Sequence, residues 1–317
     1  MTTSGRSGGK PFAKHIVVEP DASRDYWQNR SDNTLPPPDM VGAYMRNRPL
    51  PTAGIETRKA WIIGSGIAGL AAAFYLIRDG HMPPDNITII ESLDIEGGSL
   101  DGAGNAEEGY IVRGGREMNW NYDNFWDLFQ DVPALELPEG FSVLDEYRMV
   151  NDADPNFSKA RLMHKQGQIR DFSTFELSKP QQWELMRLLL KRKEDLDDIT
   201  IEAYFSEGFL QSNFWFFWRS MFAFENWHSL LEMKLYMHRF LDAIDGLNDM
   251  SALVFPKYNQ FDSFVRPLVK LLQDKGVRIR FGTRVDDLDM VTADGTRTVT
   301  AIRAKAGGIE EIIPVGP

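Results

Sequence analysis

The stretch at residues 60–80, AWIIGSGIAGLAAAFYLIRDG, decides the fold. It opens on a short apolar run that is typical of a buried strand. Gly64, Gly66 and Gly69 follow in the order G-x-G-x-x-G, and residues 67–78 then have the Ala- and Leu-rich composition of a helix. This spacing predicts a strand, a tight glycine turn and a helix. The N-terminus of such a helix receives a pyrophosphate, because its free N–H groups and its dipole favour negative charge.

The sequence downstream supports this interpretation. A turn-rich segment, DGHMPPDN, leads into the apolar run Ile87–Ile90, which predicts a second strand. That run ends on Glu91, 22 positions after Gly69. An acid at about that distance hydrogen-bonds the ribose of an adenine dinucleotide. The alternative is a glycine-rich turn in another α/β protein, and the register of strand, turn, helix, strand and acid makes it the weaker one.

The composition of the whole chain bounds the classes of function. The chain has 317 residues, of which 43% are hydrophobic and 26% are charged, as in ordinary globular proteins. Its net charge of −11 argues against a nucleic-acid partner, since no basic excess neutralises phosphates. It has no cysteine, and therefore no disulfide, thiolate nucleophile or thiolate metal site. With no apolar run near the roughly 20 residues of a membrane span, we expect a cytoplasmic protein.

The chain is expected to contain three regions. Residues 1–55 have few periodic apolar positions and several prolines, which favours an extended arm. Residues 56–150 and 251–317 are assigned to a dinucleotide-binding domain, and residues 151–250 to a mostly helical substrate region. The predicted fold class is therefore α/β, a Rossmann-like parallel sheet with an inserted helical region. The aromatic stretch 212–244 indicates plain core or the lining of an apolar cavity, and plain core is the simpler interpretation.

Further glycine clusters favour FAD over a nicotinamide cofactor. Gly97-Gly98-Ser99 follows the second predicted strand, and the segment RGGRE (113–117) follows another short one. A nicotinamide enzyme needs only the first glycine turn and the ribose acid. The additional glycines allow the backbone to approach a larger and more deeply bound cofactor.

Several segments together resemble one known family. GSGIAGLAAAFYLIRDG, EGGSLDG, GYIVRGGREM, EDLDD, SNFW, MFAFENWHS, EM…Y and KYNQ are similar to the oleate hydratases, flavoprotein fatty-acid hydratases also called myosin-cross-reactive antigens. The resemblance runs from about Thr57 to Val315. It implies addition of water to the cis-9 double bond of oleic or linoleic acid, giving a 10-hydroxy fatty acid, with FAD bound and no net redox change. Because chains of that family continue further, we expect a C-terminally truncated member whose activity and FAD binding are open.

The resemblance also assigns roles to residues. By motif match, the water-activating carboxylate is Glu117, the proton donor to the alkene is Tyr236, and the contact of the fatty-acid carboxylate is Gln260, with Met118 and Asn259 as further substrate contacts. A phenol is protonated and a carboxylate ionised at neutral pH, as these roles require. The expected FAD contacts are Gly64, Ser65, Gly66, Ala68, Gly69, Glu91, Gly97, Gly98, Ser99, Arg113, Gly114, Gly115, Arg116 and Val285.

Simpler interpretations stand beside these assignments. Glu117 can be an ion-pair partner of a neighbouring arginine, and Tyr236 a core residue of a helix. Asp127 is interpreted as part of a solvated helix face, and the isolated histidines predict no metal site. The competing functions are a flavin oxidoreductase of the amine-oxidase or desaturase type, and a non-catalytic FAD-binding fragment. An unsaturated fatty acid is the expected partner, with a homodimer and a peripheral membrane contact left open.

Overall fold

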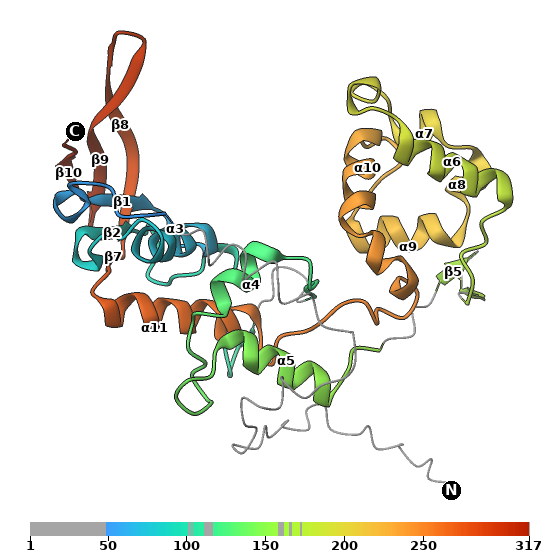
Figure 1. The fold of residues 1–317 in the computed structure, drawn as a ribbon, viewed down its shortest axis with the longest axis horizontal. Helices are drawn as coiled ribbons and strands as arrows, with labels where there is room; N and C mark the ends of the chain where they lie inside the picture. The colour runs from blue at the N-terminus through green and yellow to red at the C-terminus, as the bar shows by residue number, and fades with distance from the viewer. Residues whose placement is uncertain are drawn as a thin grey trace, which may run out of the picture. The chain divides into compact units, whose positions relative to one another are not determined.

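The structure is a computed structural model of the chain (Figure 1). It describes residues 49–100, 102, 104–110, 117–157, 162–164, 167–171 and 173–316. The chain forms two compact units. Unit 1 comprises the described residues within 1–116, 122–153 and 256–317, and unit 2 comprises those within 117–121 and 154–255.

A parallel three-stranded sheet is the centre of unit 1. Its strands are β1 (Ala60–Ile63), β2 (Ile87–Ile90) and β7 (Arg278–Arg280), in the order β1-β2-β7. Helix α3 (Ile67–Arg78) connects β1 to β2, so the predicted strand, turn, helix and second strand are confirmed. Every residue of β2 is buried, because this strand lies between the other two and is covered on both faces.

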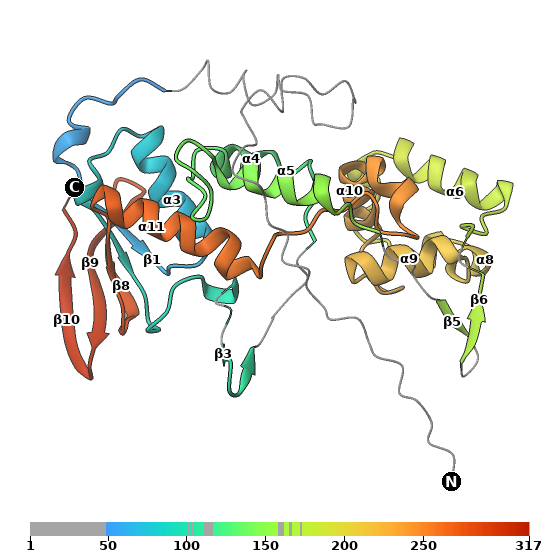
Figure 2. The same cartoon turned by 90° about the horizontal axis from the view of Figure 1, so that it is seen from below.

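Different layers cover the two faces of the parallel sheet. Ile62 faces α3, and helix α11 (Arg266–Lys275) packs alongside α3 (Figure 2). Trp61 and Ile90 point to the opposite face, since side chains alternate along a strand. There they pack against an antiparallel sheet of order β10-β9-β8. Its strands are β8 (Thr283–Ala293), β9 (Thr296–Ala306) and β10 (Ile309–Pro314).

Two further helices complete the core of unit 1. Aromatic rings of α4 (Asp123–Phe129) and α5 (Val143–Ala153) pack around Phe264, which belongs to the π-helical turn η6 (Phe261–Val265). The other described elements of this unit are short: η1 (Ile55–Thr57), η2 (Pro84–Asn86), η3 (Gly98–Leu100), β3 (Gly104–Asn105) and β4 (Gly109–Tyr110).

An ion-pair network joins α3 to α4 and corrects one expectation. Asp127 is buried, and its Oδ2 lies 2.6 Å from a guanidinium nitrogen of Arg78, which also pairs with Asp79 and Asp131. The hydroxyl of Tyr75 donates to the same carboxylate at 3.2 Å. The prediction that Asp127 lies on a solvated face was therefore wrong, because its partners come from a helix about 50 positions earlier.

Unit 2 is mostly helical. Phe214, Trp215 and Trp218 of α9 are almost fully buried, so this part of the aromatic stretch is plain core. The helices are α6 (Lys179–Leu190), α7 (Ile201–Tyr204), α8 (Glu207–Leu210), α9 (Asn213–Phe222) and α10 (Leu230–Arg239), with 3-10 turns η4 (Lys193–Asp195) and η5 (Leu241–Gly246) and the hairpin β5 (Leu162–His164) and β6 (Gln168–Arg170).

A buried lysine ties two of these helices together. Lys234 of α10 donates to the carbonyls of Leu188, Leu189 and Lys191 at the end of α6. The last carbonyls of a helix have no partner within the helix, and a cation there also interacts favourably with the helix dipole. Lys234 is therefore a structural residue.

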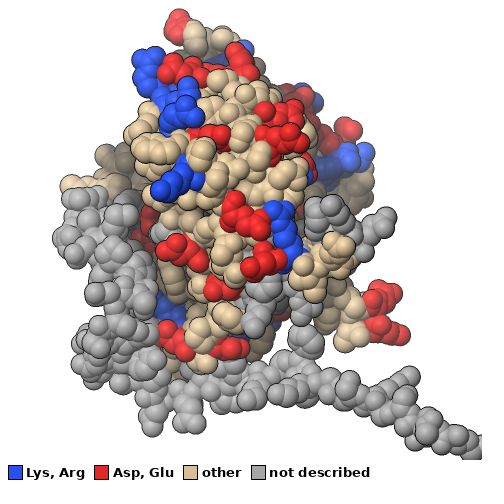
Figure 3. Space-filling model, turned by 90° about the vertical axis from the view of Figure 1, so that its right-hand side faces the viewer, with Lys and Arg blue, Asp and Glu red and all other residues tan. Residues whose placement is uncertain are grey.

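The described surface shows no single-sign region on the face drawn in Figure 3, where Lys and Arg side chains are interspersed with Asp and Glu. Within the residues that the structure describes, no helix combines the length and the apolar character that crossing a membrane requires.

Candidate functional site

The turn between β1 and α3 has the geometry that the glycine spacing predicts. Gly64 has a φ of 92°, a left-handed conformation that favours glycine, and its N–H donates to the carbonyl of Ile90 at 2.8 Å. A Cβ on Gly69 would lie 2.1 Å from the Gly64 oxygen, so the third glycine allows helix and turn to pack. At Gly66 the backbone faces open space, since a Cβ added there would have only one described atom within 4 Å, the Cα of Gly98.

The beginning of α3 is suited to an anion. Gly66 is the N-cap residue and no side chain caps the helix. Within the described structure, the N–H groups of the first turn, including that of Ala68, therefore remain available to a ligand.

The second glycine cluster lies directly against the first. The Gly97 N–H donates to the carbonyl of Ser65 at 2.9 Å, and Gly66 and Gly97 form an isolated parallel bridge. Gly98 has a φ of 58°, and a Cβ there would lie 3.1 Å from the Cα of Gly66. Ser99 follows within η3. The fold thus brings together two glycine clusters that are about 30 positions apart in the chain. We call the surface formed by residues 64–69 and 97–99 the glycine cradle.

The predicted ribose acid is turned toward this cradle. Glu91 is only 6% exposed, and its Oε2 accepts hydrogen bonds from the N–H and the hydroxyl of Ser65 at 2.8 and 2.7 Å. Its Oε1 accepts from the Leu93 N–H at 2.9 Å and the Ser92 hydroxyl at 3.1 Å. Burial opposes ionisation, but these hydrogen bonds outweigh it and lower the pKa of Glu91. A ribose hydroxyl would have to share or replace one of these donors.

The remaining predicted cofactor residues fall into two groups. Val285 packs its side chain into the core between the two sheets, and on β8 it pairs with Ala304 of β9. The start of β8 lies beside Glu91 in space, since the Thr283 N–H donates to the Glu91 carbonyl at 2.8 Å. Arg113, Gly114, Gly115 and Arg116 lie outside the described residues.

Both predicted catalytic residues belong to unit 2. Glu117 is half-buried and precedes Met118, which exchanges two backbone hydrogen bonds with Val254, at 2.8 and 3.0 Å. Further along the same segment, Asn121 accepts a hydrogen bond from Arg239, which lies one turn after Tyr236 on α10. The segment that carries Glu117 is therefore fixed within the unit that carries Tyr236.

Tyr236 lies at the edge of an aromatic cluster. Its ring contacts Phe222, Phe224 and Phe240, with centroid separations of 5.7, 5.1 and 5.9 Å. It is nevertheless 41% exposed, unlike the buried Phe224 and Phe240. The exposure of Tyr236 disfavours the alternative that it is a core residue. A phenol beside an apolar wall is suited to donate a proton to a hydrocarbon.

The KYNQ segment (257–260) leads into η6. The side chain of Asn259 is committed locally, because it accepts from the Asp262 N–H and donates to the Asp262 carboxylate, both at 2.8 Å. Gln260 precedes the π-helical turn directly. The next residue, Phe261, abuts Gly102, where a Cβ would lie 2.9 Å from the Phe261 Cβ. The segment thus contacts the loop that carries the second glycine cluster.

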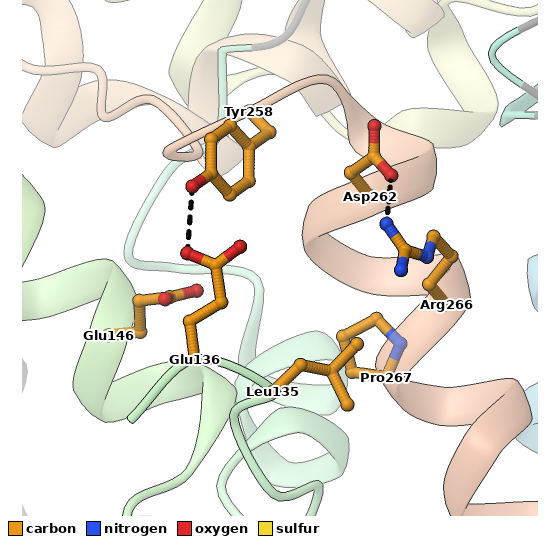
Figure 4. Close-up of a pocket in the computed structure, with 7 residues that line it drawn as sticks. All are labelled: Leu135, Glu136, Glu146, Tyr258, Asp262, Arg266 and Pro267. Carbon is orange, nitrogen blue, oxygen red and sulfur yellow. Dashed lines mark hydrogen bonds and ion pairs between the residues drawn. The ribbon is translucent and has the colours of Figure 1, made fainter. Parts of the chain in front are cut away.

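A pocket of about 390 Å³ opens beside this segment within unit 1 (Figure 4). On its wall, Glu136 Oε2 accepts from the Tyr258 hydroxyl at 2.7 Å and from Lys257 Nζ at 2.8 Å. These hydrogen bonds lower the pKa of Glu136, whereas burial raises the pKa of Glu146. No pattern in the sequence predicted this cluster. The pocket is lined by Leu135, Glu136, Glu146, Tyr258, Asp262, Arg266 and Pro267.

Comparison with known sequences gives the family. The profile of the MCRA family matches residues 57–317. The chain belongs to the MCRA family. It is 44% identical over 265 residues to an oleate hydratase of Streptococcus pyogenes serotype M49 (strain NZ131), which covers 83% of this chain and 45% of that protein. It is 30% identical over 240 residues to a linoleate hydratase of Lactiplantibacillus plantarum, covering 69% and 42%. The MCRA chain thus spans less than half the length of these curated relatives.

Solved structures similar to this MCRA chain are more distant. An oxidoreductase from Methanosarcina mazei has a TM-score of 0.48 and 14% identity, with 80% of this chain and 57% of that chain covered. A CLA-producing fatty acid isomerase from P. acnes has a TM-score of 0.46 and 15% identity, with 80% and 56% covered. At these identities the likeness concerns the fold alone.

Proposed function

We propose that this MCRA chain is part of an FAD-dependent hydratase that adds water to the cis-9 double bond of oleic or linoleic acid, giving a 10-hydroxy fatty acid. The observation that carries the proposal is the 44% identity to an oleate hydratase over 83% of the chain. Unit 1 is assigned to the cofactor, and unit 2 to the acyl chain and to both catalytic residues.

The glycine cradle fits FAD. The uncapped start of α3 and the open space in front of Gly66 suit a pyrophosphate, and a side chain at Gly66 would fill that space. When bound in its reduced form, FAD would supply negative charge that stabilises a carbocation-like transition state. The residues that would hold it are those of the two glycine clusters, the backbone beside Glu91 and that of Val285.

The reaction follows from acid and base roles on the alkene. Tyr236 donates its phenolic proton to one alkene carbon, and a water molecule forms a C–O bond to the other. Glu117 accepts the second proton of that water, and solvent returns it to Tyr236, so the product gains one H₂O. Because an alkene offers no polar handle, the rate depends on these positioned proton transfers, each contributing roughly 10²–10⁴-fold.

Substrate orientation is assigned to Gln260, whose amide would donate to the fatty-acid carboxylate. Asn259 uses its polar atoms for the turn before η6 and Met118 is buried, so both would contribute mainly to the shape of the site. Peripheral contact with a membrane is part of the proposal, since the substrate is a lipid, and a homodimer is a separate part of it.

Product analysis tests this function. The protein is loaded with FAD and incubated with oleate, and the product is analysed by mass spectrometry. A hydratase gives a mass gain of one water. A flavin oxidoreductase of the desaturase type gives a loss of two hydrogens, and a non-catalytic fragment leaves oleate unchanged. A loss of two hydrogens rejects the proposal. Unchanged oleate rejects it when the enzyme of which this chain is part gives the same result.

A further inference from the structure

Two consecutive side chains of the KYNQ segment bind one carboxylate oxygen. Lys257 Nζ and the Tyr258 hydroxyl lie 2.8 and 2.7 Å from Glu136 Oε2, more than 120 positions earlier in the chain. Figure 4 shows the Tyr258 hydroxyl pointing at Glu136 across the pocket. Charge-assisted hydrogen bonds of this kind are shorter and stronger than neutral ones. A single acceptor therefore fixes the first two residues of the KYNQ segment, Lys257 and Tyr258.

The ammonium group of Lys257 is held on a second side as well. It lies 3.6 Å from Glu146 Oε1, which is buried, and the Lys257 side chain is only 15% exposed. Burial alone would lower the pKa of Lys257, but its hydrogen bond to Glu136 and the charge of Glu146 raise it instead. Lys257 thus remains a cation between two carboxylates, and this arrangement restricts its movement.

Different contacts fix the end of the KYNQ segment, where it joins η6. The Tyr258 N–H donates to the Ser263 hydroxyl at 3.1 Å, and the Ser263 N–H donates to the Asn259 carbonyl at 3.0 Å. The π-helical turn η6 begins immediately after Gln260. Single π-helical turns occur frequently at functional sites. Gln260 therefore lies between the residues that are hydrogen-bonded to Glu136 and the π-helical turn that follows.

We propose that Glu136 is a positioning residue for Gln260. By binding Lys257 and Tyr258 it sets the direction from which the Gln260 amide meets the fatty-acid carboxylate, without touching the substrate itself. This inference rests on the proposed function, because it assumes that Gln260 recognises a carboxylate. It assigns to the cluster beside the pocket a role in selecting free fatty acids over their esters.

The test compares the affinities of oleate and methyl oleate for the FAD-loaded protein. Wild type is expected to bind oleate more tightly. Glu136→Gln is expected to lower the ratio of the two affinities by about three- to tenfold, the range of one neutral hydrogen bond. The affinity for methyl oleate stays unchanged. Tyr258→Phe removes one of the two hydrogen bonds and shifts the ratio in the same direction by less. Glu139→Gln, an equal charge change at an exposed position of the same loop, leaves the ratio as in wild type.

The possible results distinguish failure of the positioning role of Glu136 from failure of carboxylate recognition itself. A wild-type protein that binds neither ligand, or both equally, contradicts carboxylate recognition by Gln260 and so rejects that part of the proposed function together with the inference. If wild type discriminates and Glu136→Gln discriminates as well, only the positioning role is overturned. Equal losses of affinity for both ligands also overturn it, since a general loosening of unit 1 does not distinguish an acid from its ester.

Discussion

Ser65 and Glu91 are hydrogen-bonded to each other across the glycine turn. The N–H and the hydroxyl of Ser65, which is fully buried, both donate to Glu91 Oε2, at 2.8 and 2.7 Å. The middle residue of the first G-x-G is thereby tied to the end of the second strand. The acid that the sequence assigns to a ribose therefore also fixes the turn proposed to receive the pyrophosphate.

Ser65→Ala removes one of these two hydrogen bonds and leaves a buried carboxylate oxygen with one donor fewer. Hydrogen bonds to charged groups contribute about 1.5–3 kcal/mol, and we expect the free energy of unfolding to fall by that amount. Denaturant unfolding of the variant measures it. Thr298→Ala, which removes a hydroxyl from an exposed position on β9, is the matched control and changes stability by less than about 0.5 kcal/mol. A Ser65 variant as stable as that control would contradict the role of this contact.

Gly66→Val separates FAD binding from folding. A Cβ at Gly66 meets only the Gly98 Cα, at 3.9 Å, so the variant is expected to fold. Its side chain would occupy the place of the pyrophosphate, and FAD binding should be lost. Flavin absorbance after FAD loading and gel filtration measures retention. Gly69→Val is the contrasting variant, because a Cβ there would lie 2.1 Å from the Gly64 oxygen and should impair folding itself. Flavin retained at wild-type stoichiometry in folded Gly66→Val would disprove the assignment of the cradle.

The lowered pKa of Glu91 predicts a pH dependence of stability. A depressed folded-state pKa stabilises the fold above the unfolded value, which is near 4.3, and this contribution is lost as the pH falls through the folded pKa. The difference in unfolding free energy between wild type and Glu91→Gln should therefore be constant above about pH 5.5 and shrink below about pH 4.5. Denaturant unfolding across this range measures the difference. A difference that does not change down to pH 3 would contradict the ionised, hydrogen-bonded state of Glu91.

For Glu146, the pH dependence of stability is expected to have the opposite sign in the same unfolding experiment. Burial raises its pKa, so ionising it costs stability, and this cost appears as the pH rises above the unfolded value. Glu146→Gln should therefore be more favourable relative to wild type at pH 8 than at pH 4. The two variants together distinguish local effects from a general response of the protein to acid.

Local sequence patterns predicted the centre of the fold. The β1–α3–β2 unit followed from glycine spacing because each glycine meets a constraint set by residues a few positions away. The direction of Glu91 could not be predicted, since it depends on a hydroxyl 26 positions earlier that a bare G-x-G-x-x-G pattern leaves undefined. The burial of Asp127 and the contact of Glu136 with Lys257 and Tyr258 depend on partners from distant segments. Periodicity of one segment contains no information about such partners.

Glu117→Gln and Tyr236→Phe test the acid and base roles in turnover. The first variant keeps the size of the side chain and removes the base, and the second keeps the ring and removes the proton. In the complete enzyme, each should lower the turnover of oleate by about 10²–10⁴-fold while leaving fatty-acid affinity nearly unchanged. Steady-state turnover and direct binding are measured on the same preparations. Phe222→Leu, in the wall beside Tyr236, is the control and should affect affinity more than turnover. Near-normal turnover in Tyr236→Phe would remove Tyr236 from the mechanism, and a loss confined to affinity would make Glu117 a structural residue.

The central claim, that the chain is part of an enzyme that hydrates a fatty-acid double bond, is tested most directly with ¹⁸O-labelled water. The FAD-loaded enzyme of which this chain is part is incubated with oleate in labelled water, and the position and isotope of the product hydroxyl are determined by mass spectrometry. The account predicts a saturated 10-hydroxy acid with one ¹⁸O on C10 and no change in the oxidation state of the flavin. A product that has lost two hydrogens, an isomer of unchanged mass, or oleate recovered without label would contradict it.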